Sequence, residues 1–397
     1  MSLYQQLGLE PIINVSGSVT RLGGAPLPES VVRAFCEAAG ETVPLDQLQA
    51  AASQRLAEIT GTQAGLVTAG SAAALTLGAA AILCRDNLSH MERLPDCDGF
   101  PHEFVMAREQ RSGYDHAVRL SGATLREVGF NEMVSNAGVR RTETWEYEAA
   151  FGPETAGVLY VHAPDSRPSL AEVVECAHRH QLPVLVDAAG ELPPRNNLSA
   201  IPATRADLVC FSGGKAIRGP QSTGILCGQK ELIASAAVQM LDMDDHPELW
   251  DPPADLIDRS RFAGMPRHGI GRPMKVSREE IVALLAALDL FVSGEYDAQN
   301  ELYRGYLRQI IQGIRSCPVT CTLIDPADSE TLPRLEIALD ETTPGRTAFD
   351  VCRSLRNGSP PIYVGHSRLP EGCLIINPLW LNEARTDMLI RSLREVL

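Results

Sequence analysis

The chain has 397 residues, enough for a large hydrophobic core in one or two domains. It carries 35 Lys and Arg against 50 Asp and Glu, a formal net charge of −15, and only 5% of its residues are aromatic. An acidic, aromatic-poor chain is a poor binder of nucleic-acid backbones and bases. No apolar run of about 18 residues occurs, and the start lacks a basic segment followed by an apolar one, so we expect neither a membrane span nor a secretory signal.

The ten cysteines are scattered along the chain, and most of them stand in apolar runs. This pattern predicts reduced, buried thiols in a cytoplasmic protein. Neither an HExxH motif nor a CxxC pair is present, so the sequence predicts no metal site.

Segments with the spacing of strands alternate with segments with the spacing of helices. In chain order we expect a helix at 45–59, a strand at 64–67, a helix at 71–83, a strand at 104–106, a helix at 114–120, a strand at 157–161, a helix at 170–180, strands at 183–187 and 208–211, and helices at 279–293 and 301–314. Several strands are apolar on both faces, which is typical of a mainly parallel sheet covered by helices on both sides. The sequence therefore predicts an α/β fold.

Changes in composition suggest the domain boundaries. Residues 1–45 are rich in turn formers, and residues 241–273 are first acidic and proline-rich, then rich in glycine and proline. We expect an N-terminal arm at 1–45, a large domain at 46–265 and a smaller C-terminal α/β domain at 266–397. The arm either packs on the small domain or crosses to a partner subunit, and the sequence leaves both alternatives open.

Two polar motifs follow predicted strands, at the edge where open α/β sheets bind their ligands. Gly70, Ser71 and Ala72 open the helix after the strand at 64–67, where free N–H groups and the helix dipole form a cradle for an anion. Ser71 as a simple N-cap is an equally good interpretation. Asp187 directly follows an apolar run, and a buried carboxylate needs a cation or hydrogen-bond donors. Alternatively, it caps the next turn.

A third motif, Ser212-Gly213-Gly214-Lys215, follows the strand at 208–211. A partly desolvated lysine amine is a nucleophile toward a carbonyl carbon. A P-loop is excluded, because its first glycine is missing and Ala216 stands where a P-loop needs Ser or Thr. The three motifs together match a pyridoxal 5′-phosphate (PLP) site, in which the cradle holds the phosphate, Asp187 pairs with the pyridine nitrogen and Lys215 forms a Schiff base with the aldehyde.

With these motifs the chain resembles the fold-type-I PLP enzymes. Within them it is similar to the branch of bacterial selenocysteine synthase (L-seryl-tRNA selenium transferase) and of relatives such as D-glucosaminate-6-phosphate ammonia-lyase. The resemblance spans roughly residues 10–300 and fades in the last hundred residues. It rests on segments in family order, at 13–18, 20–24, 67–74, 186–189, 206–209, 212–215, 219–224 and 271–276.

The resemblance implies an aspartate aminotransferase-like fold with a large PLP-binding domain, and active sites at a subunit interface, hence at least a homodimer. It implies that Lys215 is the catalytic, cofactor-linked lysine and that Asp187 is the pyridine partner. Phosphate contacts would come from the cradle at 70–72, with help from Ser212. Gln110 stands where the superfamily often places an aromatic or histidine side chain that stacks on the ring.

The resemblance also implies substrate-binding residues, although the chain departs from the family pattern. An arginine that binds the substrate carboxylate is expected near position 365, where this chain has Gly365. The candidates for that role are instead Arg21, Arg272 and Arg368. Two further candidates are Asn14, in the first family segment, and His162, which follows the strand at 157–161 and could contact the cofactor or act as an acid. A loop histidine with a purely structural role is the favoured alternative for His162.

For the reaction, the resemblance favours a lyase that removes the Cα proton of an amino acid or amino-sugar acid and eliminates a β-substituent, releasing a 2-oxo acid and ammonia. A racemase, an aldolase and an aminotransferase use the same chemistry at Cα and stay open. We give less weight to selenium transfer on tRNA, because the chain is acidic and shows no basic stripe. A non-catalytic PLP-binding protein is a further alternative.

Overall fold

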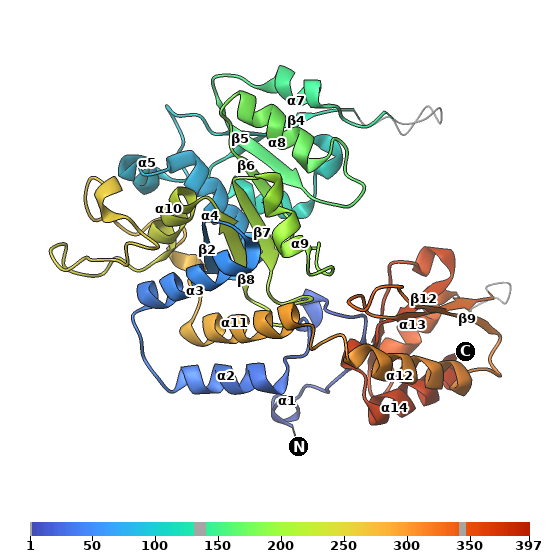
Figure 1. Ribbon diagram of the computed structural model, residues 1–397. Coiled ribbons are helices and arrows are strands. Elements are labelled where there is room, and N and C mark those ends of the chain that lie inside the picture. The colour runs from blue at the N-terminus through green and yellow to red at the C-terminus, as the bar shows by residue number, and fades with distance from the viewer. Residues whose placement is uncertain (1, 131–139, 341–346) are drawn as a thin grey trace. The chain divides into compact units, whose positions relative to one another are not determined.

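A computed structural model describes residues 2–130, 140–340 and 347–397 (Figure 1). Its internal contacts divide the chain into a larger unit, Pro28–Asp289, and a smaller unit made of Met1–Leu27 and Leu290–Leu397. This division differs from the boundaries expected after residues 45 and 265. Within the described ranges, every helix is too short or too polar to cross a membrane.

A seven-stranded, mostly parallel sheet forms the centre of the larger unit, which confirms the expected fold class. Only β8 runs antiparallel to its two neighbours. In spatial order the strands are β2 (Ala64–Thr68), β8 (Gly224–Gly228), β7 (Leu208–Ser212), β6 (Val184–Asp187), β5 (Thr155–Val161), β3 (Glu103–Ala107) and β4 (Thr124–Val128). The sequence patterns did not predict β4 and β8.

Helices follow most strands of this unit (Figure 1). They are α2 (Glu29–Ala39), α3 (Leu45–Thr60), α4 (Gly70–Cys84), α5 (Leu88–Arg93), α6 (His116–Arg119), α7 (Thr144–Ala150), α8 (Leu170–Arg179), α9 (Asn197–Ala200), α10 (Lys230–Met240) and α11 (Arg278–Ser293). The helix α2 lies in the segment that we expected to be an arm of turns. Its first residue follows Pro28, which is well suited to starting a helix.

Helix α4 is apolar on all sides and is buried from Ala73 to its end. Gly78 lets it lie close to the sheet, because a Cβ at this position would come within 2.9 Å of Leu185 Cδ1 and 3.4 Å of both Leu208 Cδ1 and Leu226 Cδ1. These three leucines stand on β6, β7 and β8. The helix thus crosses the middle of the sheet, and its N-terminus reaches the carboxyl edge of β2.

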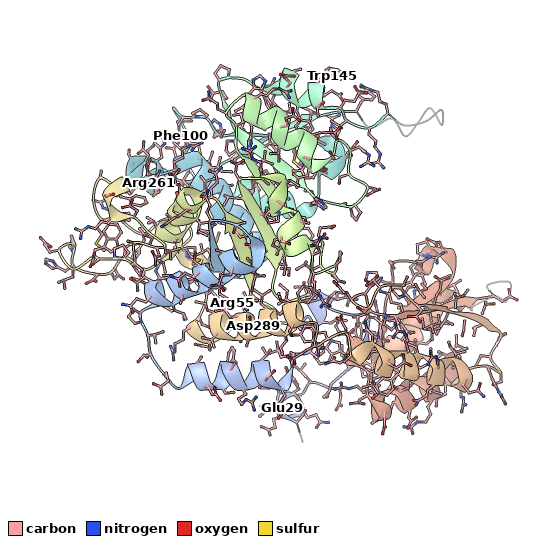
Figure 2. All side chains as sticks on the ribbon, in the orientation of Figure 1. Glu29, Arg55, Phe100, Trp145, Arg261 and Asp289 are labelled. Carbon is pink, nitrogen blue, oxygen red and sulfur yellow. The ribbon has the colours of Figure 1, made fainter. Side chains whose placement is uncertain are left out.

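Polar contacts attach α2 and α11 to the larger unit. On α3, Arg55 forms a 2.6 Å ion pair with Asp289 of α11 (Figure 2). Arg278, at the start of α11, donates hydrogen bonds to the carbonyl oxygens of Ala38 and Ala39 at the end of α2. These contacts explain why the segments 28–45 and 266–289 fall within the larger unit rather than outside it.

At the amino-terminal edge of the sheet, the buried carboxylate of Asp207 joins three segments. It accepts hydrogen bonds from the Val184 N–H at 2.7 Å, from His178 Nε2 at 2.9 Å and from Gln229 Nε2 at 2.5 Å. Asp207 thereby fixes the starts of β6 and β7 relative to α8. The bond to Asp207 gives His178 a structural role.

The smaller unit contains two sheets. In one, β1 (Ile13–Val15) pairs in parallel with β11 (Ile362–Val364), and in the other the antiparallel order is β12 (Cys373–Ile376), β10 (Arg334–Leu339) and β9 (Val319–Ile324). Its helices are α1 (Leu3–Gln6), α12 (Gln299–Gly313), α13 (Ala348–Arg356) and α14 (Glu383–Val396). Ile13 and Val15 belong to its apolar core. The N-terminal segment therefore packs on the C-terminal part of the same chain, the first of the two alternatives above.

The Asp207 cluster gives a test of the fold. We expect Asp207→Ala to lower the free energy of unfolding by on the order of 3 kcal/mol, because it leaves buried donors without an acceptor. Urea denaturation followed by circular dichroism measures this change. Asp251→Ala, in an exposed loop, is the matched control and should change stability by less than about 0.5 kcal/mol. Equal stability of the two variants would contradict the assigned role of Asp207.

Candidate active site

The candidate site lies at the carboxyl edge of the central sheet, where β2, β5, β6 and β7 end. Asp187 is the last residue of β6 and pairs in register with Val161 on one side and Cys210 on the other. Lys215 follows β7 by three residues. The sheet thus brings the ends of β5, β6 and β7, which are far apart in the sequence, to one edge.

The carboxyl group of Asp187 is the central titratable group of this edge. Burial raises its pKa above the ordinary value, while a hydrogen bond from the Ala189 N–H and the positive charge of Lys215 act in the opposite direction. The Ala189 nitrogen lies 3.0 Å from Asp187 Oδ1. The charge of Lys215 thus favours the ionised form of this carboxyl group.

A tight turn holds Lys215. The Gly213 N–H donates to the Thr223 carbonyl at 2.9 Å, and the Gly219 N–H donates to the Gly213 carbonyl at 2.9 Å. A Cβ on Gly214 would lie 2.6 Å from the Gln221 Cα, closer than packed atoms can approach. The two glycines are therefore needed for close packing of the turn, and this packing fixes the backbone of Lys215.

The start of α4, the predicted cradle, follows the end of β2 at the same sheet edge. Gly70 has a φ of +88°, and Ala69, at the N-cap, provides no side-chain hydrogen bond to the first turn. The interpretation of Ser71 as the N-cap is therefore wrong, because Ser71 lies inside the helix. Its carbonyl oxygen is 3.3 Å from Cys210 Sγ, which places the cradle next to the strand residue that pairs with Asp187.

Strand β8 brings Ser212 to the same cradle. Gly224 pairs in register with Ser212 of β7 and with Thr68 of β2. A Cβ on Gly224 would come within 2.4 Å of the Gly70 carbonyl carbon and 2.6 Å of the Ser71 nitrogen, so only glycine allows this approach. The turn at 212–215 and the helix N-terminus thus meet across one glycine.

Gln110 follows β3, in the short helical turn Arg108–Gln110, and its side chain reaches β5. Its Oε1 accepts a hydrogen bond of 3.0 Å from the Val161 N–H. Its Nε2 is buried and has no hydrogen-bond partner among the described residues. At the position where the family places a stacking ring, this chain therefore has an amide that is fixed at its oxygen and has an unused donor.

His162 stands beside Asp187 at the end of β5 and has an acidic neighbour that the sequence analysis missed. The His162 N–H donates to the Asp187 carbonyl at 2.9 Å, and His162 Nδ1 lies 3.4 Å from Glu191 Oε2. Both side chains are largely buried. Glu191 follows Asp187 by four residues in the loop after β6, and this position was the only signal for it in the sequence.

Two other residues with a predicted substrate role, Arg272 and Arg368, form ion pairs of their own. Arg272 forms an ion pair with Asp242 and lines a cavity of about 520 Å³ that Lys275 also lines. Arg368 is exposed and forms ion pairs with Glu336 and Glu371, so its charge is already compensated. Neither contact joins these arginines to Asp187 or Lys215.

In the smaller unit, Asn14 forms two hydrogen bonds within its own loop. Its Nδ2 donates to the Gly17 carbonyl at 3.0 Å, and its Oδ1 accepts from the Ser16 N–H at 2.9 Å. This bonding gives Asn14 a role in shaping the loop. The smaller unit also explains the departure at Gly365, where a Cβ would lie 3.0 Å from Ile375 Cβ, so that an arginine there would displace the neighbouring strand.

The larger unit's residues fit the cofactor that the sequence motifs predict. The uncapped N-terminus of α4 suits a phosphate, the partly buried Asp187 carboxyl forms no ion pair with any described residue, and the Gln110 amide has a donor without a partner in the same part of the chain. A protonated ring nitrogen facing Asp187 would satisfy the carboxylate, and a ring substituent could accept from Gln110. The electrostatic requirements of the site and the chemistry of PLP are thus complementary.

Comparison with known proteins identifies the family of this chain. The family described as SelA, L-seryl-tRNA selenium transferase, matches residues 114–243. A 5′-C-glycyluridine monooxygenase-decarboxylase from a Streptomyces species is 30% identical over 405 residues, covering 99% of this chain and 92% of its own length. A D-glucosaminate-6-phosphate ammonia lyase from Salmonella typhimurium is 26% identical over 404 residues, covering 100% and 98%.

Solved structures show the same relationship. A structure of D-glucosaminate-6-phosphate ammonia-lyase superposes with a TM-score of 0.80 at 26% identity, covering 100% of this chain and 98% of its own. Serine palmitoyltransferase from S. paucimobilis with a bound PLP–myriocin aldimine has a TM-score of 0.52 at 12% identity and covers 98% of this chain and 88% of its own. The second likeness concerns the fold alone.

The raised pKa of Asp187 predicts that the variant Asp187→Asn is more stable than the wild type without the cofactor but binds PLP less tightly. Because burial disfavours the ionised carboxylate, the neutral amide of Asp187→Asn should raise the melting temperature of the cofactor-free protein at pH 7. The gain should shrink as the pH falls toward about 4, where the unfolded carboxyl also becomes protonated. The same variant should retain PLP less well, because an amide cannot balance a ring cation.

Differential scanning calorimetry of the free protein and dialysis of the loaded protein measure these two effects. Asp251→Asn, in an exposed loop, is the matched control and should change neither. A cofactor-free Asp187→Asn protein that is less stable than the wild type at pH 7 would contradict the assignment of an unfavourable buried charge.

The variant Gln110→Glu tests the role of the Nε2 donor separately from that of the Oε1 acceptor. A glutamate keeps an oxygen for the Val161 N–H but removes the unused Nε2 donor. We expect the dissociation constant of PLP to rise about 5- to 10-fold, the usual effect of one lost hydrogen bond. Titration followed by the visible absorbance of the cofactor measures it, with Gln47→Glu, an exposed residue of α3, as the control. An unchanged dissociation constant would show that the cofactor does not use this donor.

Proposed function

The chain belongs to the SelA-like branch of the fold-type-I PLP-dependent enzymes, and we propose that it is an ammonia-lyase acting on an amino-sugar acid. In this reaction the substrate loses its Cα proton and its Cβ hydroxyl group. The enamine that is released takes up water, and the products are a 2-oxo acid and ammonia. Water is lost in the first part and gained in the second, so the net change is deamination.

One observation carries the proposal: a likeness that extends over the whole chain, in sequence and in fold, to D-glucosaminate-6-phosphate ammonia-lyase. The neighbouring Lys215 and Asp187 support it, because they provide an amine and a buried carboxyl group at one edge of the sheet. A fold alone does not determine a reaction, so the proposal rests on these side chains as well.

In this proposal, Asp187, the N-terminus of α4 and Lys215 have different roles. When bound, PLP supplies a ring that accepts the electrons left at Cα. Asp187 holds the positive charge of the ring nitrogen, and the N-terminus of α4, at Gly70 and Ser71, binds the phosphate. Lys215 binds the cofactor and then, as a free amine, takes the Cα proton at its Nζ.

Loss of a hydroxyl group needs a proton donor, and the structure offers a candidate. We assign this role to His162, whose Nδ1 faces Glu191 at 3.4 Å. A carboxylate beside one ring nitrogen orients the imidazole. His162 would then protonate the departing oxygen from its other nitrogen.

A second candidate function follows from the 30% identical relative, whose name combines monooxygenase and decarboxylase activity. Removal of a carboxyl group instead of a proton from Cα would use the same ring and the same Asp187. The two functions give different products, because the second releases carbon dioxide and consumes oxygen. Racemisation, aldol cleavage and amino transfer would release neither carbon dioxide nor ammonia and would consume no oxygen.

We further propose a homodimer in the cytoplasm that does not bind nucleic acid. All ten cysteines are free thiols, which suits a reducing compartment. The net charge of −15 disfavours a tRNA partner, although the matched family is named for one. Analytical ultracentrifugation tests the homodimer, and a tRNA retention assay tests whether the protein binds nucleic acid.

Lys215→Ala tests the proposed function. The wild-type protein, loaded with PLP, should release equal amounts of ammonia and 2-oxo acid from D-glucosaminate 6-phosphate or a close analogue. Lys215→Ala should lower the turnover at least about 100-fold, since a general base contributes about 10²- to 10⁴-fold. Borohydride should fix the cofactor covalently in the wild type and not in the variant. Lys230→Ala, on α10, serves as the control.

The outcome of the same assay separates the candidates. Carbon dioxide release and oxygen uptake without ammonia would replace the lyase by the decarboxylase. Undiminished ammonia release by Lys215→Ala would overturn the assignment of the catalytic lysine.

A further inference from the structure

A cavity of about 330 Å³ opens at the amino-terminal edge of the central sheet, the edge opposite to that of Lys215. Leu182 and Pro183, which precede β6, line it, together with Arg205, which precedes β7, and Arg85, which ends α4. All lining residues belong to the larger unit. Strand β6 has four residues, so its two ends, and with them the cavity and the candidate active site, are separated by on the order of 13 Å.

Two arginines in the wall of this cavity have no partner for their charge. Within the described ranges, the side chains of Arg85 and Arg205 form no ion pair, no hydrogen bond and no contact with an aromatic ring. By comparison, Arg21 of the smaller unit, which the sequence analysis selected, lies over the ring of Tyr363, with 5.5 Å between the guanidinium carbon and the ring centre. The cavity thus holds two uncompensated guanidinium groups in a chain whose net charge is −15.

The carboxylates close to the cavity are already engaged. Asp86, which follows the end of α4, forms a 3.4 Å ion pair with Arg261, labelled in Figure 2, and Glu231 of α10 pairs with the same arginine. Asp207 lines the cavity, but its carboxylate is buried and accepts the three hydrogen bonds described above. The two arginines of the wall therefore keep their positive charge at the cavity.

The first turn of α10 adds to this positive potential. Gln229 is the N-cap of α10 and provides no side-chain hydrogen bond to the first turn, and its Nε2 donates instead to Asp207. Gln229 and Leu232, which belong to this end of the helix, both line the cavity. The positive end of the helix dipole therefore lies at the same cavity as the two guanidinium groups.

The backbone around the cavity is strained at the positions of these arginines. Among the described residues, four that are not glycine have a positive φ, and three of them line this cavity: Arg85 at +49°, Gln181 at +58° and Arg205 at +69°. A side chain disfavours this conformation, which glycine adopts freely. Such strain is typical of functional sites. The fold thus keeps two guanidinium groups at positions where glycine would relieve the backbone.

We propose that Arg85 and Arg205 form a binding site for a small molecule that carries an oxyanion, and that this site is separate from the active site. Guanidinium groups donate paired hydrogen bonds to the oxygens of a phosphate or a carboxylate. The volume of about 330 Å³ falls within the range of small-molecule sites. Because the cavity and Lys215 lie at opposite edges of the sheet, the bound molecule is not the one that reacts.

Inorganic phosphate is the first probe, titrated by isothermal calorimetry into the PLP-loaded protein so that the cradle on α4 is occupied. We expect Arg85→Met and Arg205→Met each to weaken phosphate binding at least about 10-fold, because a charge-assisted contact is lost. Arg179→Met is the matched control, since Arg179 is an exposed arginine of α8 that already pairs with Glu148 at 3.6 Å. The same titrations with acetate distinguish the two oxyanions: the probe that loses more affinity in the variants identifies the class of ligand.

Glycine variants separate binding from a purely structural role of the arginines. Arg85 is the C-cap of α4, where a positive charge also compensates the negative end of the helix. Arg85→Gly and Arg205→Gly remove the guanidinium group but suit a positive φ. We expect them to lose phosphate affinity as the methionine variants do and to melt at a higher temperature than those variants in phosphate-free buffer. Phosphate should raise the melting temperature of the wild type and of none of the four variants.

Phosphate and acetate affinities that are equal in wild type, Arg85→Met and Arg205→Met would overturn the site. A lower melting temperature of all four variants with unchanged affinity for both anions would show that the arginines serve only the fold. The affinity for PLP, measured by its visible absorbance, should be the same in the wild type and the variants. A parallel loss of PLP affinity would contradict a site separate from the active site.

Discussion

A partly buried carboxylate at the end of a central strand is the constraint from which the candidate site follows. Burial removes water from Asp187, and within the described ranges the carboxyl group is compensated by one backbone hydrogen bond, from Ala189, and by the charge of Lys215. An ionised carboxylate in this position is costly unless a cation faces it. The free protein therefore holds an unfavourable charge in place, and a ligand with a protonated ring nitrogen removes that cost when it binds. The buried charge therefore makes the free protein less stable and makes binding selective for such a ligand.

Close backbone approaches make this arrangement possible. Gly78 lets α4 cross the sheet, Gly224 lets the N-terminus of α4 approach the end of β7, and Gly214 lets the lysine turn fold onto Gln221. At each of these positions a single Cβ would come within 2.4–2.9 Å of a neighbouring atom. The three glycines, which have no Cβ, thus allow the close packing that positions the cradle, the carboxylate and the amine.

The sequence predicts those parts of the fold and site that depend on local pattern. The apolar runs that became β6 and β7 are continuous, so the first polar residue after each, Asp187 or Ser212, marks the strand end without any knowledge of the partners. The domain boundaries could not be found in this way, because α2 and α11 join the larger unit through contacts such as Arg55 with Asp289 that are remote in sequence. Glu191 was missed for the same reason, since only the fold brings it to His162.

The relatives of this chain carry names of different reactions, although they share its length and family, so the groups around the reacting carbon must decide between them. Asp187 and Lys215 serve removal of either a proton or a carboxyl group from Cα and cannot discriminate. Elimination makes one further demand, a proton for the departing oxygen. The His162–Glu191 pair is our proposed source of this proton, because His162 Nδ1 lies 3.4 Å from Glu191 Oε2 and the His162 N–H donates to the Asp187 carbonyl at the same sheet edge. On chemical grounds, this pair favours elimination for the present chain.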